Sequence, residues 1–270
     1  MGKYQVIKTS FASLSYAVYN GGGNEVLLFF PGFGQDEIQY RALLEVLGEK
    51  YKARVIAIDL FYHGNSEWLK QEQPILIEEW KHLMELLVEK ESIQKWRLMG
   101  YSMGGRFAML TASLFIDRVE HLSLVAPDGI TLSGWYKFAV ENPLSRGVFK
   151  NVVLKNSSFL RRMAERISLL GLLDKKVYRF SISQLQTKEQ RERVYYSWVV
   201  FRNIQVNIVK FAELLNSNKI PVDFYIGEHD RMITVKRIQP LMKLLPDSTL
   251  FLYPSGHTHL LNDIAKKIKG

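Results

Sequence analysis

The 270 residues carry 36 Lys and Arg against 27 Asp and Glu, and the 47% hydrophobic content is that of a globular protein with a sizeable core. The absence of cysteine excludes disulfides, thiolate metal sites and a cysteine nucleophile. No apolar run is long enough to span a membrane and the first ten residues lack an apolar signal region, so we expect a soluble cytoplasmic protein.

The N-terminal segments predict strands of one sheet. Segments 4–9 and 13–20 have the pattern of an antiparallel pair at a sheet edge, and "GGGN" at 21–24 suits a hairpin turn. The continuous apolar runs "EVLLFF" (25–30) and "RVIAIDL" (54–60) are typical of strands that are covered on both faces. A helical pattern over 36–48 separates these two runs.

The next elements surround an unusual serine. A helix is predicted over 76–90, a strand over "WRLMGY" (96–101) and a helix over 103–115, which leaves Ser102 in the turn between strand and helix. Gly100 and Gly104 supply the small residues that a strained turn of this kind needs, and the helix N-terminus offers N–H groups to developing negative charge. Ser102 is therefore a candidate nucleophile, and a tight packing turn is the alternative.

The strand "HLSLVA" (121–126) is followed by a long segment without strand patterns. Residues 130–219 show helical periodicity, best seen in "SSFLRRMAERISLLG" (157–171), and residues 131–219 hold 16 Lys and Arg against 6 Asp and Glu. This basic segment fits a solvated surface, a cleft for an anionic substrate, or a site for docking on an anionic membrane. Nucleic-acid binding is not expected because no recognition motif accompanies the charge.

The last strands supply candidate partners for the serine. Asp230 follows the strand "VDFYIG" (222–227) and a helix over 234–244 comes next, while His257 follows the strand "TLFLYP" (249–254) and a helix over 257–268 ends the chain. A serine nucleophile needs a histidine base, and the base needs an acid that orients it. His259 is the rival base, and the rival acids are Asp128, which also follows a strand, and Glu228.

The alternation of strands and helices predicts the fold class. It indicates an α/β protein with a doubly wound, mostly parallel sheet. Residues 1–129 and 220–270 would form the sheet domain, and residues 130–219 a basic helical cap inserted between two strands.

Four motifs together resemble the α/β-hydrolase fold family: "GYSMGG" at 100–105, "PGFG" at 31–34, "GEHD" at 227–230 and "SGH" at 255–257. The resemblance implies a serine hydrolase that cleaves a carboxylic ester or thioester of a small molecule, with Ser102, Asp230 and His257 as the catalytic triad. It also implies an oxyanion hole made by the N–H groups of Phe33 and Met103, and no metal or other cofactor. His63 would be a structural loop residue.

The elbow "GYSMGGR" (100–106) is also similar to that of the SHCHC synthases of the menaquinone pathway, which are lyases with this fold. This second likeness implies that Tyr101 and Arg106 contact an anionic substrate, although Arg106 could instead pair with a nearby carboxylate. A lyase of that kind and a non-catalytic ligand receptor are therefore the alternative functions.

Overall fold

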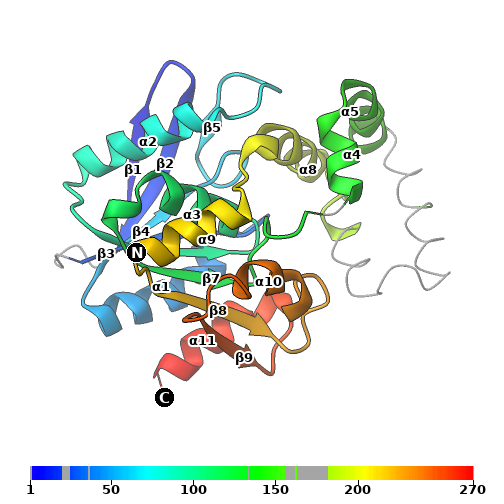
Figure 1. The fold of residues 1–270 in the computed structure, drawn as a ribbon. Coiled ribbons are helices and arrows are strands. Elements are labelled where there is room, and N and C mark those ends of the chain that lie inside the picture. Colours follow the sequence, from blue (N-terminus) through cyan, green and yellow to red (C-terminus); the bar gives the residue numbers. More distant parts are fainter. Residues whose placement is uncertain are drawn as a thin grey trace. The chain divides into compact units, whose positions relative to one another are not determined.

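The computed structural model describes residues 2–19, 25–35, 37–132, 134–155, 162 and 182–269. The chain forms two compact units, which we call the sheet unit (Met1–Lys70, Leu76–Thr131 and Ile204–Gly270) and the helical unit (Gln71–Ile75 and Leu132–Asn203). Figure 1 shows the elements of both. The expected turn at 21–24 lies outside the described residues, as does nearly all of the expected helix at 157–171.

In the described residues, the sheet unit is built on one mixed sheet of nine strands, in the order β1-β2-β4-β3-β6-β7-β8-β9 with β5 beside β2. Strands β3, β4 and β6 to β9 are parallel, whereas β1, β2 and β5 are antiparallel to their neighbours. All six expected parallel strands are confirmed, and all five residues of β3 are buried. The strands are β1 (Lys3–Lys8), β2 (Ala12–Tyr19), β3 (Val26–Phe30), β4 (Arg54–Ile58), β5 (Glu67–Trp68), β6 (Trp96–Tyr101), β7 (Val119–Val125), β8 (Val222–Gly227) and β9 (Thr249–Tyr253).

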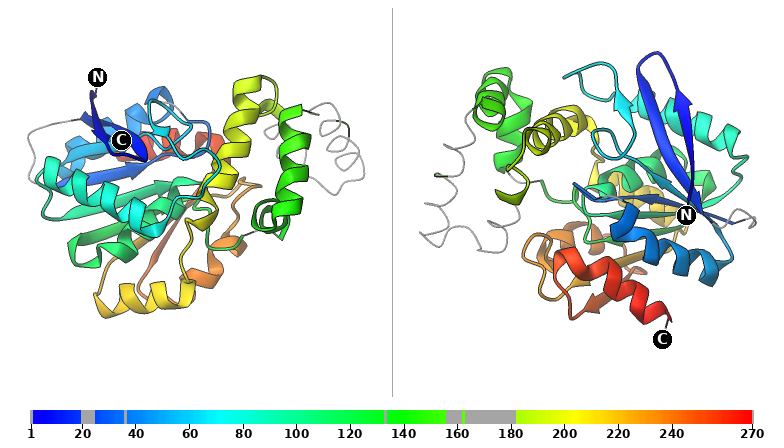
Figure 2. Two further views of the ribbon diagram at one scale, coloured as in Figure 1. Left: turned by 90° about the horizontal axis from the view of Figure 1, so that it is seen from above. Right: turned by 180° about the vertical axis from the view of Figure 1, so that it is seen from behind.

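Helices cover both faces of this sheet, as a doubly wound fold requires (Figures 1 and 2). Successive side chains of β3 point to opposite faces, so Phe29 packs against Tyr40 of α1 while Phe30 packs against Trp80 of α2 and Phe107 of α3. α11 lies beside α1, and α9 beside α3 and α10. The helices of this unit are α1 (Glu37–Tyr51), α2 (Ile77–Lys90), α3 (Gly104–Leu114), α9 (Ile208–Ser217), α10 (Val235–Met242) and α11 (Leu260–Lys269), with 3₁₀ turns at Ile116–Arg118 and His257–His259.

The helical unit contains α4 (Gly134–Glu141), α5 (Pro143–Lys150), a π-helical turn (Asn151–Lys155), α8 (Lys188–Val200) and a 3₁₀ turn (Phe201–Asn203). Phe149 of α5 stacks on Trp198 of α8 with ring centroids 5.3 Å apart, and Tyr195 is fully buried. The short segment Gln71–Ile75 joins this unit through Glu72, whose carboxylate accepts hydrogen bonds from Tyr195 and Lys150.

The unit boundaries differ from the domain limits expected at 130 and 219. The helical insertion ends at Asn203, and α9 belongs to the sheet unit because its buried residues Phe211, Ala212 and Leu215 lie on the helix face that packs in that unit. An amphipathic pattern predicts a helix but does not tell which body the helix packs against. No helix in the described ranges has the length and hydropathy needed to cross a bilayer.

Candidate active site

Ser102 occupies the turn between β6 and α3 in a strained backbone conformation. Its φ of +50° is in the left-handed region, which costs a non-glycine residue about 1–2 kcal/mol. The Ser102 N–H donates to the Val125 carbonyl at 2.9 Å, and its carbonyl accepts from the Asp128 N–H at 2.8 Å. These two hydrogen bonds to β7 and the loop after it hold the turn in place.

The glycines around Ser102 are required by close packing. A Cβ at Gly104 would lie 2.0 Å from the Phe30 carbonyl oxygen, and one at Gly100 would lie 2.7 Å from the Cβ of Ala108. Neither approach is possible for a residue with a side chain unless α3 moves away from β3 and β6. The G-x-S-x-G pattern therefore places the N-terminus of α3 directly against the strand ends.

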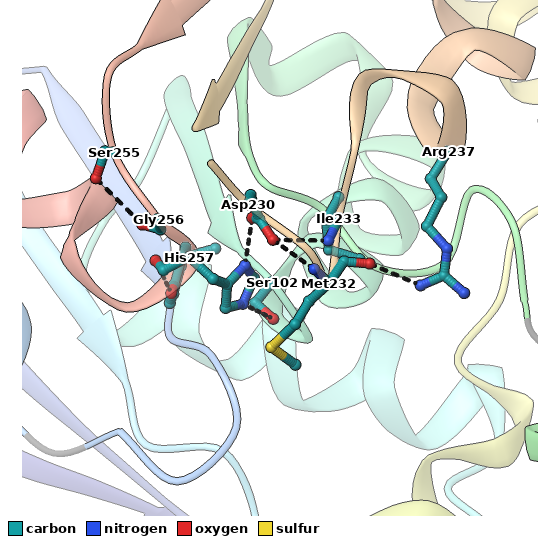
Figure 3. Close-up of polar contacts among 9 residues, drawn as sticks. Ser102, Asp230, Met232, Ile233, Arg237, Ser255, Gly256 and His257 are labelled. Atoms are coloured by element: carbon teal, nitrogen blue, oxygen red, sulfur yellow. Dashed lines mark hydrogen bonds and ion pairs between the residues drawn. The ribbon is translucent and has the colours of Figure 1, made fainter. Parts of the chain in front are cut away.

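The structure brings Ser102, His257 and Asp230 together (Figure 3). His257 Nε2 lies 3.0 Å from Ser102 Oγ, and His257 Nδ1 lies 2.6 Å from Asp230 Oδ2. A carboxylate can only accept, so Nδ1 carries the hydrogen and Nε2 is left to accept from the serine hydroxyl. All three residues follow the carboxyl ends of parallel strands, namely β6, β8 and β9, which meet at one edge of the sheet.

Asp230 is fixed by its own loop. Its side chain is fully buried, and its second oxygen, Oδ1, accepts from the N–H groups of Met232 at 2.7 Å and Ile233 at 2.9 Å. The carboxylate therefore receives three hydrogen bonds, which satisfy a buried charge. These two backbone donors were not foreseen from the sequence, although an aspartate that starts a turn often accepts from the N–H groups two and three residues ahead.

Tyr101 contacts both the ring and the backbone carbonyl of His257. Its ring lies against the His257 imidazole, with centroids 5.2 Å apart and planes at 30°, and its hydroxyl donates to the His257 carbonyl at 2.7 Å. Burial, reinforced by the Asp230 carboxylate, raises the pKa of Tyr101 well above its ordinary value, so the phenol stays a neutral donor. In the structure Tyr101 contacts His257, whereas its expected contact with substrate stays a prediction.

The two expected oxyanion donors lie in the turns next to the serine. Met103 directly precedes α3, and Phe33 is in the turn after β3, where the Gly32 N–H donates to Gln35 Oε1 at 2.8 Å. Neither the Phe33 N–H nor the Met103 N–H donates a hydrogen bond to an acceptor in the described ranges. Both groups thus fit the expected role, which stays a prediction.

None of the rival side chains hydrogen-bonds to Ser102, His257 or Asp230. Asp128 accepts from Arg106, with Oδ2 2.8 Å from Nε and 2.5 Å from Nη2. His259 and Glu228 are exposed, and the buried His63 ring contacts the Phe61 carbonyl through Nδ1 at 2.9 Å. Only Asp230 among the three candidate acids contacts His257.

Arg106 is positioned differently from a substrate-binding cation. Its side chain is 7% exposed, and the Asp128 carboxylate balances its charge. A buried guanidinium that is already paired gains little by binding a substrate carboxylate, because it would have to give up its present partner. The structure thus shows the carboxylate pairing that was the alternative, and a substrate contact at Arg106 receives no geometric support.

No group of three or more His, Asp and Glu side chains in the described ranges is arranged to hold a metal ion. The site just described is an arrangement for nucleophilic and proton-transfer chemistry, in which a hydroxyl, an imidazole and a carboxylate are joined in series.

Comparison with known proteins identifies the family. A family model described as alpha/beta hydrolase fold matches residues 25–263, so the chain belongs to the α/β-hydrolase fold family.

Individual relatives are distant. The chain is 24% identical over 254 residues to an sn-1-specific diacylglycerol lipase of Danio rerio, covering 90% of this chain and 76% of that protein. It is 29% identical over 103 residues to a putative esterase/lipase of Mycoplasma pneumoniae, covering 37% of each. For three of the curated relatives, the match spans only 31% to 39% of their length. A thermophilic esterase from Thermogutta terrifontis, solved with malate bound, has the same fold, with a TM-score of 0.68 and 20% identity over 98% of this chain and 97% of that one.

Proposed function

We propose that this protein is a serine hydrolase that cleaves a carboxylic ester or thioester of a small molecule through an acyl-enzyme on Ser102. The observation that carries the proposal is the unbroken series of contacts from Asp230 through His257 to Ser102. Relatives named as esterases and lipases support the same reaction class.

Acylation follows from the geometry. Ser102 Oγ attacks the carbonyl carbon of the substrate while its proton passes to His257 Nε2, 3.0 Å away. Asp230 stabilises the resulting imidazolium through Nδ1, and the N–H groups of Phe33 and Met103 would donate to the oxyanion. The bond from carbon to the leaving oxygen or sulfur then breaks, the leaving group takes the proton from Nε2, and the acyl group stays as an ester on Ser102.

Deacylation reverses these roles. His257 Nε2 takes a proton from a water molecule as the water oxygen attacks the acyl carbon of the Ser102 ester. Collapse of the tetrahedral intermediate breaks the bond to Ser102 Oγ, which recovers its proton from His257, and the carboxylic acid leaves. The net reaction consumes one water molecule for each ester bond and needs no other reactant.

The alternatives receive less support. The hypothesis of a lyase of the SHCHC-synthase type requires Arg106 to bind substrate carboxylates. Arg106 is instead paired with Asp128. Binding a ligand without catalysis does not require His257 to contact the Ser102 hydroxyl. In a receptor, the backbone strain at Ser102 would also have no function.

A fluorophosphonate probe tests the proposal, because it phosphonylates only an activated serine. Peptide mapping should find the label on Ser102, and Ser102→Ala should abolish both labelling and hydrolysis of a series of aryl esters and thioesters with increasing acyl length. Labelling that persists in Ser102→Ala would refute the assignment of the nucleophile. Labelling of Ser102 without turnover of any ester or thioester would refute hydrolysis and favour the lyase or the receptor.

A further inference from the structure

A cavity lies in the sheet unit, and none of the residues that line it belongs to the candidate triad. Its volume is about 260 Å³, and it is bounded by the last turns of α1 and α11 and by one face of the sheet. The strand residues that line it, which include Arg97, Tyr225 and Phe251, come from β3 and β6 to β9, and all except Tyr253, the last residue of β9, lie in the amino-terminal and middle parts of their strands. Ser102 follows the opposite, carboxyl end of β6. The cavity therefore belongs to a different part of the molecule from the catalytic residues.

The floor of this cavity is aromatic and partly open. The rings of Tyr225 and Phe251 stack with centroids 4.9 Å apart and planes at 16°, and neither residue is fully buried. This is unusual for Tyr225, because β8 is an interior strand and helices normally cover both faces of such strands. The two rings lie nearly parallel, one over the other, and in a concave site the outer face of one of them offers a surface on which a third planar ring can stack.

The rim of the cavity is cationic. Lys50 in the last turn of α1 and Lys267 in the last turn of α11 both line it, and neither forms an ion pair with a described residue. Arg97 also lines the cavity, although its Nε lies 3.2 Å from Glu25 Oε2. Lysines near the C-terminus of a helix interact favourably with the negative end of the helix dipole. This interaction offsets part of the positive charge of Lys50 and Lys267.

Aromatic rings hold these cations in place. The Lys267 Nζ lies 5.0 Å from the centroid of the Tyr253 ring, and Lys50 and Arg97 lie 5.5 Å and 4.9 Å from the Tyr51 ring. None of the described residues that line the cavity is acidic, and Asp223, the partner of the lining residue His121, pairs with its Nε2 at 3.1 Å. Two lysines without acidic partners among the described residues therefore face the cavity.

We propose that this cavity binds a small planar aromatic anion. Its ring would extend the stack of Tyr225 and Phe251, and its carboxylate, sulfonate or phosphate group would lie between Lys50 and Lys267. The volume is slightly below the range of about 300–1,000 Å³ that ligand pockets usually have, so the ligand is small. This binding does not depend on Ser102 or on the proposed hydrolysis.

The probe for this site is 2-naphthoate, compared with the uncharged 2-naphthamide by isothermal titration calorimetry. Lys267→Gln should weaken 2-naphthoate about fivefold, which is the upper range for an exposed ion pair, and leave 2-naphthamide unchanged. Phe251→Ala should weaken both compounds about tenfold because each loses the stacking surface. Lys266→Gln is the matched control, since Lys266 is the preceding residue of α11, is 80% exposed and pairs with Asp263 instead.

The comparison of the two lysine variants decides the question even if Phe251→Ala fails to fold. A loss of affinity in Lys267→Gln that is absent in Lys266→Gln supports the site. The proposal is overturned if the wild-type protein does not bind 2-naphthoate, or if Lys267→Gln binds it as tightly as Lys266→Gln does.

Discussion

At the scale of single residues, the sequence indicates which chemistry is present but not which of two neighbours performs it. Both His257 and His259 follow β9, and only the 3₁₀ turn that they share decides which ring is buried against Ser102 and which is exposed. Asp128 and Asp230 likewise both follow strands, and the choice between them depends on a contact of Asp128 with Arg106, 22 residues away in sequence. Such contacts depend on the packing of the whole sheet unit and have no local pattern.

The first prediction separates the candidate triad from its rivals. His257→Ala and Asp230→Asn should each lower kcat on the order of 10⁴-fold, because the serine loses its base or the base loses the acid that orients it. His259→Ala should lower kcat less than about threefold, as expected for an exposed ring without a role in the reaction. Steady-state kinetics on an aryl ester, with circular dichroism as the folding control, measures both effects.

Asp128→Asn serves as a control of a different kind. It should reduce stability by about 1–3 kcal/mol, since Arg106 stays buried without a charged partner, while kcat falls by less than about tenfold. If Asp128→Asn lowers kcat more than Asp230→Asn does, Asp128 is the catalytic acid and the role proposed for Asp230 is wrong.

At the scale of elements, continuous apolar runs predict the central strands well, because both faces of a parallel sheet are buried and the pattern needs no partner to be recognised. The two-residue strand β5 is too short to have such a pattern, and it exists only because Ala12 and Ser13 of β2 lie opposite it. The same limit applies to Gln71–Ile75, which has no helix or strand pattern and joins the helical unit through individual hydrogen bonds.

The second prediction concerns the packing of α3 on the sheet. Gly104→Ala should lower the free energy of unfolding by about 3 kcal/mol or more, because its Cβ would meet the backbone oxygen of Phe30 at 2.0 Å. Gly147→Ala in α5 is the matched substitution, since no atom lies within 4 Å of a Cβ there, and it should raise stability by about 0.5–1 kcal/mol. Denaturant unfolding followed by tryptophan fluorescence compares the two, and equal effects of both substitutions would contradict the packing argument.

The third prediction concerns the attachment of Gln71–Ile75 to the helical unit. Burial tends to raise the pKa of Glu72, but the hydrogen bonds from Lys150 and Tyr195 outweigh it and hold the pKa below its ordinary value. Glu72→Gln keeps the shape of the side chain and removes the charge, so the Ile75 N–H, which donates to the Val200 carbonyl at 2.9 Å, should exchange with deuterium faster at neutral pH. Glu192→Gln on α8 is the control, because its partner Lys188 is exposed.

The pH dependence of this attachment has a definite sign. A carboxyl group with a lowered pKa in the folded protein stabilises the fold above its unfolded pKa, and this contribution is lost as the pH falls through the folded pKa. The difference in Tm between wild type and Glu72→Gln should therefore be largest near neutral pH and shrink below the ordinary carboxyl range. A difference that grows on acidification would show that Glu72 does not act through its charge.

At the scale of the whole molecule, the net positive charge is concentrated in one segment of the chain. The net charge of +9 arises from residues 131–219, whereas the rest of the chain is close to neutral. Within the helical unit, some of the basic side chains already have partners. Lys150 pairs with the Glu72 carboxylate, and the Arg202 guanidinium donates to the Glu72 carbonyl. The remaining positive charge of residues 131–219 produces an electrostatic potential. Salt screens this potential over a Debye length of about 10 Å at 0.1 M and about 3 Å at 1 M.

The last prediction follows from this field. A neutral aryl ester and the same ester with a terminal carboxylate should differ in kcat/KM at about 10 mM salt, with the anionic ester several-fold faster, and should converge at about 1 M salt. Lys137→Glu, at an exposed position of α4, should reduce the preference at low salt. Arg106→Ala combined with Asp128→Asn removes the whole ion pair without changing the net charge, and should leave the preference unchanged. Equal rates for both esters at low salt would contradict steering by the basic segment. A preference that persists at high salt and disappears when Arg106 and Asp128 are replaced together would instead mean that Arg106 leaves Asp128 and contacts the substrate directly.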